Sequence, residues 1–312
     1  MTLNNQKYVY NNFVDFFFIK FPFIFPIFYV FILYTFPELE NYLILTTIIL
    51  LAEPHFGATW AIFFDKRNYE YHINKAKLYY GGSLIIILFS VLGFFYFQGL
   101  FFLVFYGFNI YHVTKQSLGI VKLYNLDNKE KKYQIFFIYN LNFLFFLIGL
   151  FRFYIPIINE DNLFFLNLII ISCIILIFLY QLKRYNSIQN SFTTLTGMII
   201  FMPILFVEKP IHAILLGVTM HYSQYIFISA KVFAGRRKNK LFGSKFLLYI
   251  LFYGLIMGFL TSQNHIGDDF SKNLILIPLI GQMLHFYLDG FLWKFSEKHN
   301  RENTLRYIFQ KN

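Results

Sequence analysis

The chain has 312 residues, of which 57% are hydrophobic, 23% aromatic and only 14% charged. A water-soluble domain carries about a quarter charged residues, so this composition excludes an ordinary soluble globular protein. The net charge of +11 would suit nucleic acid, but Lys and Arg cluster in alternate loops, which indicates membrane topology instead.

Apolar runs of about 20 residues recur along the whole chain, and each can cross a hydrocarbon core of about 30 Å as a helix. We therefore predict an all-α polytopic membrane protein with about ten transmembrane helices in one bundle. The connections are short, so residues 1–312 are expected to form a single transmembrane domain. The predicted spans are residues 13–36, 41–64, 78–97, 99–121, 134–154, 162–182, 192–207, 210–230, 245–262 and 273–293.

The orientation follows from the basic residues. Alternate loops, the N-terminal segment and the C-terminal tail hold 22 of the 27 Lys and Arg residues, whereas the opposite loops hold only Arg152, Lys209 and Lys272. Positively charged loops stay on the cytoplasmic side. Both termini are therefore expected in the cytoplasm, and the expected location is a bacterial inner membrane.

Four histidines lie inside apolar runs at one depth. His55, His112 and His221 each stand ten residues before the charged residue that ends the run, and His285 stands nine residues before it. Helix rise then places all four roughly 15 Å from the cytoplasmic helix ends, near the middle of the membrane. Ionisable groups inside spans are rare and mark functional sites. We therefore interpret the four histidines as the ligands of one intramembrane metal ion.

Other polar residues accompany these histidines at helical spacing. Gln116 follows His112 by four residues and Asp289 follows His285 by four, so each pair shares a helix face. Asp289 is expected to accept the second ring N–H of a ligating histidine. The set expected to support the metal or line a substrate channel is Glu53, Gln116, Gln224, Tyr225 and Asp289.

The donor set indicates which metals fit. Imidazoles with a few oxygen atoms suit Fe, Zn or Cu, and structural Zn sites usually contain thiolates. Three or four neutral histidines around Fe(II) would leave positions for O₂ and a substrate. A site in mid-membrane is open to lipophilic molecules, so the expected partners are a lipophilic substrate, O₂ and membrane lipids, with no nucleic acid. Fe(II) is the expected cofactor, with Zn or Cu as alternatives.

The order and placement of these residues resemble the Brp/Blh family of membrane β-carotene 15,15′-dioxygenases. The residues that carry the resemblance are Pro54-His55 followed by Phe56-Gly57, then His112, His221, and His285 with Asp289. The resemblance implies a retinal-forming enzyme that uses iron held by intramembrane histidines. It implies oxidative cleavage of a polyene, carotenoid-like substrate.

The chain departs from the family pattern at three places. Thr59 stands where the early motif carries an Asp, and residues 113–116 replace a Gly and an Asp of the second motif. Tyr225 stands where the third motif has a second histidine one turn further on. A diverged relative with another lipophilic substrate also fits these residues.

Two other functional classes fit the same residues. A haem-binding electron-transfer protein would use facing histidines as axial ligands, although two stacked haems need two levels and the four histidines share one. A proton-coupled or metal transporter would use His, Glu53, Lys115 and Asp289 as a relay. Transporters often contain internal repeats and broken helices. No repeat is visible in this sequence, and Pro54 is the only helix-breaking residue in a span near the histidines.

Overall fold

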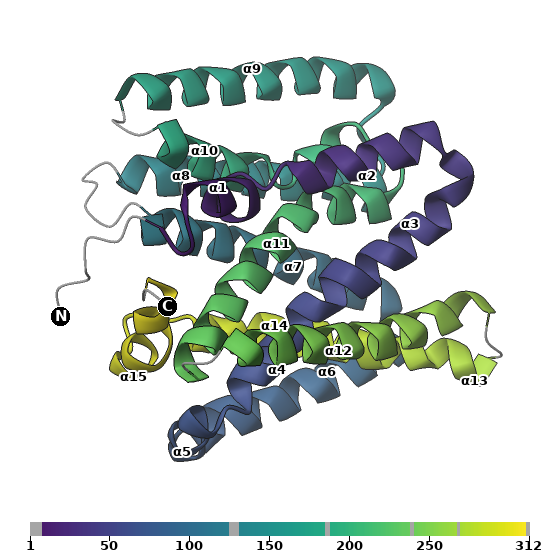
Figure 1. The fold of residues 1–312 in the computed structure, drawn as a ribbon. Helices are drawn as coiled ribbons and strands as arrows, with labels where there is room; N and C mark the ends of the chain where they lie inside the picture. The colour runs from purple at the N-terminus through teal and green to yellow at the C-terminus, as the bar shows by residue number, and fades with distance from the viewer. Residues whose placement is uncertain (1–7, 125–130, 185–187, 238–239, 267–268, 310–312) are drawn as a thin grey trace. The chain divides into compact units, whose positions relative to one another are not determined.

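The computed structural model describes residues 8–124, 131–184, 188–237, 240–266 and 269–309. Within these ranges the chain forms helices and loops and contains no strand (Figure 1). Residues 1–7 and 125–130, whose lysines contribute to the predicted orientation, lie outside the described residues. The all-α prediction is confirmed for the described part of the chain.

Seven helices of the described residues are long and apolar enough to cross a membrane. This finding supports the prediction of a polytopic helical membrane protein. The seven are Pro37–Phe63, Lys77–Tyr96, Lys132–Tyr154, Asp161–Lys183, Pro210–Arg236, Gly243–Gln263 and Asn273–Leu292.

The predicted count of about ten spans is not confirmed. The first predicted span corresponds to two helical segments, Asn12–Lys20 and Ile24–Thr35, that meet at 54° and could count as an eighth span. Predicted span 99–121 lies within α7 (Gln98–Tyr124), whose polar residues lower its mean hydropathy. Predicted span 192–207 falls on α10 (Ile188–Ile199) and the short 3₁₀ turn η6 (Met202–Leu205), which are too short.

The chain divides into two compact units, each made of separate stretches of sequence. Unit 1 contains residues 1–11, 41–108 and 225–312, and unit 2 contains residues 12–40 and 109–224. The long helices α7 and α11 (Pro210–Arg237) each contribute one part to each unit.

Unit 1 is built around four helices, α4, α6, α12 and α14, of which α4 packs on both α12 and α14 and α6 packs on α14. Small residues bring α12 close to α4 and to the preceding turn η3. A Cβ on Gly57 of α4 would lie 2.8 Å from Tyr253 of α12, and one on Gly254 of α12 would lie 2.4 Å from the carbonyl oxygen of Ile49 in η3. The elements of unit 1 are α3 (Glu40–Thr47), η3 (Ile48–Ala52), α4 (Glu53–Phe63), α5 (Lys66–Asn74), η4 (Lys77–Gly81), α6 (Gly82–Tyr96), α12 (Lys240–Ile266), α13 (Asp269–Lys272), η7 (Asn273–Ile275), α14 (Leu276–Leu292), α15 (Lys298–Asn300), η8 (Arg301–Leu305) and α16 (Arg306–Ile308).

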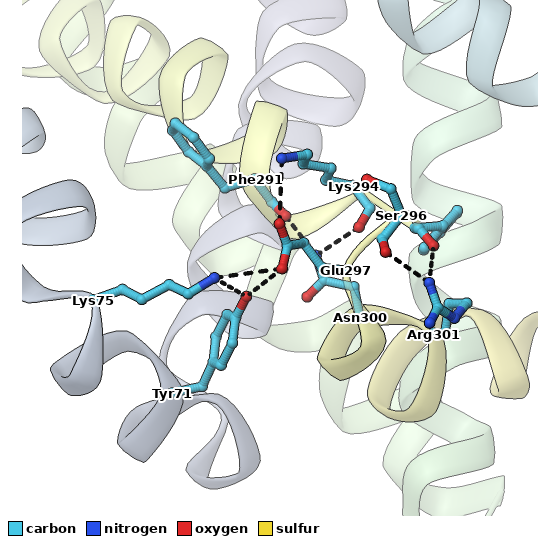
Figure 2. A network of polar contacts seen from close by, with 9 residues as sticks. Tyr71, Lys75, Phe291, Lys294, Ser296, Glu297, Asn300 and Arg301 are labelled. Carbon is cyan, nitrogen blue, oxygen red and sulfur yellow. Dashed lines mark hydrogen bonds and ion pairs between the residues drawn. The ribbon is translucent and has the colours of Figure 1, made fainter.

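The C-terminal segment of unit 1 is attached to α5 by polar contacts (Figure 2). The Glu297 carboxylate accepts hydrogen bonds from Tyr71 of α5 and from Lys75, which directly follows α5, each at 3.4 Å, and from Lys294 at 3.2 Å. Arg301 donates to the backbone carbonyl of Ser296 at 2.7 Å and so closes the turn that follows α14. These contacts join the segment that follows α14 to the region of α5.

Unit 2 contains a helix that breaks at Lys20. The carbonyls at the end of the π-helical segment η1 are satisfied by side chains from α10 and α11, as orphan carbonyls at a helix end require. Gln224 donates to Ile19 at 2.7 Å, and Thr196 donates to Lys20 at 2.7 Å. The elements of unit 2 besides α10 and η6 are α1 (Asn12–Asp15), η1 (Phe16–Lys20), α2 (Ile24–Thr35), η2 (Pro37–Leu39), α8 (Lys131–Gly149), η5 (Leu150–Tyr154) and α9 (Glu160–Arg184).

Large apolar side chains cover the outer faces of several helices. The most apolar 18-residue stretch of the helix Asp161–Lys183 has a mean hydropathy of 2.8, and only 17% of that stretch is buried. Leu168 and Leu176 on α9 are 52% and 65% exposed, and Leu84 on α6 is 57% exposed. Such surfaces would be unfavourable in water and are suited to lipid tails.

Candidate metal centre

His55 lies near the start of α4, where Pro54 interrupts the regular hydrogen bonding of the helix. Pro54 has no N–H to donate to the preceding turn, and the π-helical turn η3 directly precedes α4. The predicted irregularity at Pro54 is thus a π-helical turn within the continuous helix Pro37–Phe63. Turns of this type are frequent at functional sites.

His55 and His285 lie side by side in the core of unit 1. Their ring centroids are 4.3 Å apart, with the ring planes at 70°. His55 is 1% exposed and His285 is 0% exposed. Phe56 lies against both rings, with centroid distances of 4.8 Å and 4.9 Å. The two rings are therefore packed against Phe56 and shielded from water.

Thr59, one turn beyond His55 on α4, is the centre of a buried hydrogen-bond network. Its Oγ1 lies 2.7 Å from the hydroxyl of Tyr225, 2.7 Å from Nδ1 of His285 and 2.8 Å from Oδ1 of Asp289. Thr59 and His285 are both 0% exposed. Three side chains from α11 and α14 thus meet at one hydroxyl group from α4.

Asp289 lies within ion-pair distance of His285 but does not hydrogen-bond directly to its Nδ1. The distance from Nδ1 of His285 to Oδ1 of Asp289 is 3.8 Å, beyond hydrogen-bond range. Thr59 stands between them and hydrogen-bonds to both. On a regular helix, residues four apart have neighbouring Cβ atoms, but their polar atoms need not be within bonding distance. The predicted carboxylate–histidine link is therefore made through a hydroxyl group.

Tyr225 is held by the same network. Its hydroxyl donates to Oδ1 of Asp289 at 2.8 Å and accepts a hydrogen bond from Nε1 of Trp293 at 3.0 Å. Its ring lies 4.5 Å from that of His55. The phenol oxygen is thus engaged with neighbouring side chains, which favours a supporting role over that of a metal ligand.

Glu53 is the other acidic residue of unit 1 that was predicted to support the site. It is 1% exposed, and its Oε1 accepts a hydrogen bond from Gln282 at 3.1 Å. Its Oε2 has no hydrogen-bond partner among the described residues. A buried carboxyl oxygen is costly to leave unsatisfied, so this atom is available to a ligand or a cation.

Unit 2 contains the second histidine pair. His112 on α7 and His221 on α11 have ring centroids 5.6 Å apart, with the ring planes at 82°. Both residues are buried, and their ligand atoms lie within 4.8 Å of each other. Histidine-rich groups with this spacing could hold a metal ion, which accords with the predicted metal binding.

The other predicted residues of unit 2 have different surroundings. Gln224 is buried but binds the Ile19 carbonyl of the broken helix, which is a structural role. Gln116 is half-buried on α7, one turn beyond His112. The ammonium of Lys115, on the same helix, lies 5.5 Å and 5.6 Å from the centres of the Tyr111 and Tyr139 rings.

Two groups were missed by reasoning from the sequence. Thr59 follows His55 by four residues and Trp293 follows Asp289 by four, so helical spacing is a signal that could have found both.

Unit 2 contains a separate polar cluster around His212. The His212 ring hydrogen-bonds to Tyr29 at 2.7 Å and to Glu40 at 2.9 Å, and Glu40 forms an ion pair with Lys209 at 2.6 Å. His212 therefore belongs to a polar cluster with Tyr29, Glu40 and Lys209.

Comparison with known protein families, curated proteins and solved structures finds no match. Function is therefore inferred from the residues and from the geometry within each unit.

Proposed function

We propose that this chain is a membrane-embedded oxygenase that binds iron through His55, His112, His221 and His285 and oxidatively cleaves a lipophilic, carotenoid-like polyene. The observation that carries the proposal is a set of four buried imidazoles, three of which (His55, His221 and His285) lie on helices long and apolar enough to cross a membrane. Their common depth in the sequence supports their assignment to a single ion.

The donor set fits iron. Imidazole nitrogens suit Fe, Zn and Cu, and the only thiol of the chain, Cys173, is exposed rather than buried with the histidines. Iron would supply the redox chemistry by which O₂ reacts with the polyene. The protein would hold the ion, orient the imidazoles and exclude water from them.

The surroundings of His55 and His285 favour an apolar substrate. Phe56 packs on both rings, and Phe286 lies 6.3 Å from Phe56 and 5.7 Å from Phe105 by ring centroids. These aromatic side chains offer no charged or hydrogen-bonding group to a polar substrate. A lipophilic molecule dissolved in the bilayer could approach such a site from between the helices.

The proposal is tested by expressing the full chain in a host that accumulates carotenoids, with metal analysis of the purified protein. Bleaching of the host together with release of a retinal-type aldehyde is expected, as is iron that His55→Ala, His112→Ala and His285→Ala each lose. His299→Ala, on the C-terminal segment, is the control and should keep the metal. Full metal retention in all three site variants would overturn the metal site, and metal without bleaching would overturn the substrate alone. An intense Soret band would identify haem instead.

One observation favours a second candidate function, that of a transporter. The helix that breaks at 54° after Lys20 places a buried lysine at the break, where its ammonium donates to Gln189 at 2.8 Å. Discontinuous helices of this kind form ion and substrate sites in transporters. Proton or metal flux into vesicles containing the purified protein, lost in Lys20→Met, would favour this function over the oxygenase.

A further inference from the structure

We propose that Thr59 is a positioning residue that fixes the tautomer of His285, so that Nε2 is the nitrogen presented to a metal ion. The inference rests on the proposed metal site, but the hydrogen bonds that carry it all lie within unit 1. It assigns a role to a residue that is neither a ligand nor acidic.

The number of hydrogen atoms in this network limits the directions of its hydrogen bonds. Thr59 has a single hydroxyl hydrogen and three polar neighbours, namely Tyr225, His285 and Asp289. A carboxylate can only accept hydrogen bonds, and a hydrogen bond to an ionised acceptor is stronger than one to a neutral acceptor. The hydrogen of Thr59 is therefore directed at Asp289.

The state of the imidazole follows from this direction. Because the hydrogen of Thr59 is used by Asp289, Oγ1 meets His285 with a lone pair. Nδ1, only 2.7 Å away, must then carry the hydrogen and donate it to Thr59. A neutral imidazole with a hydrogen on Nδ1 has its lone pair on Nε2, which is the atom that can bind a metal.

The hydrogen bonds of Tyr225 lead to the same tautomer of His285. If the Tyr225 hydroxyl donates to Asp289, that carboxylate receives two donors and the Tyr225 oxygen accepts from Trp293, but no hydrogen then lies between the hydroxyl oxygens of Thr59 and Tyr225, which are 2.7 Å apart. If Tyr225 donates to Thr59 instead, the two lone pairs of Oγ1 accept from Tyr225 and His285. In both arrangements Nδ1 of His285 is a donor, so the tautomer does not depend on the orientation of the tyrosine hydroxyl.

Packing keeps the ring in this arrangement. His285 is 0% exposed, and its ring lies 4.3 Å from that of His55 and 4.9 Å from that of Phe56. No water is needed to satisfy Nδ1, because Thr59 already does so. The link from carboxylate through hydroxyl to imidazole thus performs the task that a direct carboxylate–histidine contact performs in other metal sites.

The test compares Thr59→Val, which keeps the branched shape but removes the hydroxyl, with Thr59→Ser, which keeps the hydroxyl. Both are made in the full chain and loaded with Co²⁺ as a spectroscopic probe. We expect Thr59→Val to weaken Co²⁺ binding by about 10- to 100-fold, the usual loss for an outer hydrogen-bond partner of a metal ligand, and to change the visible ligand-field spectrum. Thr59→Ser should restore both.

Two further variants separate positioning from packing. Thr47→Val, on the same continuous helix, removes a buried hydroxyl that bonds only its own helix, to the Leu43 carbonyl at 2.7 Å, and should leave Co²⁺ binding unchanged. Asp289→Asn keeps the shape of the carboxylate but removes its charge, so it should weaken binding as Thr59→Val does. It also serves where Thr59→Val does not fold.

A measurement without metal distinguishes failure of this inference from failure of the proposed function. In protein labelled with ¹⁵N-histidine, the His285 signal, identified by its loss in His285→Gln, should show a protonated Nδ1 in the wild type. A bare Nδ1 would overturn the inference whether or not the protein binds metal. A wild type that binds no metal but shows a protonated Nδ1 would overturn the metal site and leave the tautomer assignment standing.

Discussion

Thr59 and Tyr225, which are 166 positions apart in the sequence, share a hydrogen bond of 2.7 Å in the core of unit 1. These are two of the positions at which the chain departs from the carotene dioxygenase pattern. Each also contacts Oδ1 of Asp289, at 2.8 Å. The two departures therefore form one neutral hydroxyl pair around a single carboxylate.

This pair should behave as a coupled unit in a double-mutant cycle of Thr59→Val and Tyr225→Phe. Each single variant removes a buried hydroxyl from partners that stay buried, so each should lower the free energy of unfolding by about 1–3 kcal/mol. The double variant should cost less than the sum, with a coupling energy of about 0.5–3 kcal/mol. Reversible unfolding in mixed detergent micelles measures all four proteins. Strictly additive losses would show that the two hydroxyls act independently.

The helical class could be predicted from the sequence because a chain that crosses the lipid needs long apolar runs whose backbone hydrogen bonds are made within a helix. The number of spans could not, because α7 carries Asn109, His112, Lys115 and Gln116, and their polarity lowers the mean hydropathy of a helix that is long enough to cross. The short α10 shows the opposite case, in which an apolar stretch of sequence folds as one short helix and a turn. Hydropathy and length are therefore separate requirements.

Helical spacing places Thr59 on the face of His55, but it does not show which groups the Thr59 hydroxyl bonds. A threonine in a membrane helix usually bonds the carbonyl four residues earlier in its own helix, as Thr47, Thr114 and Thr261 do. The hydroxyl of Thr59 bonds three side chains from other helices instead. Which of these two options a threonine takes depends on the packing of neighbouring helices. The acidic residues and histidines stand out in the sequence, whereas the hydroxyl group that joins them does not.

The close approach of α4 and α12 predicts a graded response to added methyl groups. A Cβ on Gly57 would meet the Tyr253 ring at 2.8 Å, and one on Gly254 would meet the Ile49 backbone oxygen at 2.4 Å. Overpacking costs about 1–3 kcal/mol, and a backbone atom can move less than a side chain. Gly254→Ala should therefore lower the thermal midpoint more than Gly57→Ala. Gly290→Ala, whose Cβ would meet nothing within 4 Å, is the control and should be neutral or stabilising. Equal midpoints for all three variants would contradict the packing.

The contact between Gln224 and the Ile19 carbonyl predicts a structural role for that glutamine. Gln224→Met keeps the length of the side chain but leaves the carbonyl of the broken helix without its donor, which costs about 1–3 kcal/mol in a buried setting. The thermal midpoint should fall while the metal content of the folded protein stays unchanged. Gln98→Met, at an exposed position of α7, is the control for the substitution itself. Loss of metal from the folded Gln224→Met variant would show that Gln224 supports the metal site and would contradict a purely structural role.

His72 on α5, outside the membrane spans, predicts a pH dependence of stability. Burial, and to a smaller extent the charge of His299, lower its pKa to about 4, although a hydrogen bond to the Phe63 backbone opposes the shift. The ring is stacked on Phe63 at 4.6 Å and lies 4.1 Å from Tyr79. In the unfolded chain a histidine has a pKa of about 6.5.

The sign of the effect follows from these two values. Above pH 6.5 neither state binds the proton, so the contribution of His72 to stability is fully present. Between about pH 6.5 and 4 the unfolded state takes up the proton first, so stability falls as the pH falls. His72→Phe keeps an aromatic ring in this stack and removes the proton. The thermal midpoint of the wild type, minus that of His72→Phe, should therefore decrease from pH 7.5 to pH 4. A difference that is constant over this range would show that His72 takes up its proton equally well in the folded protein.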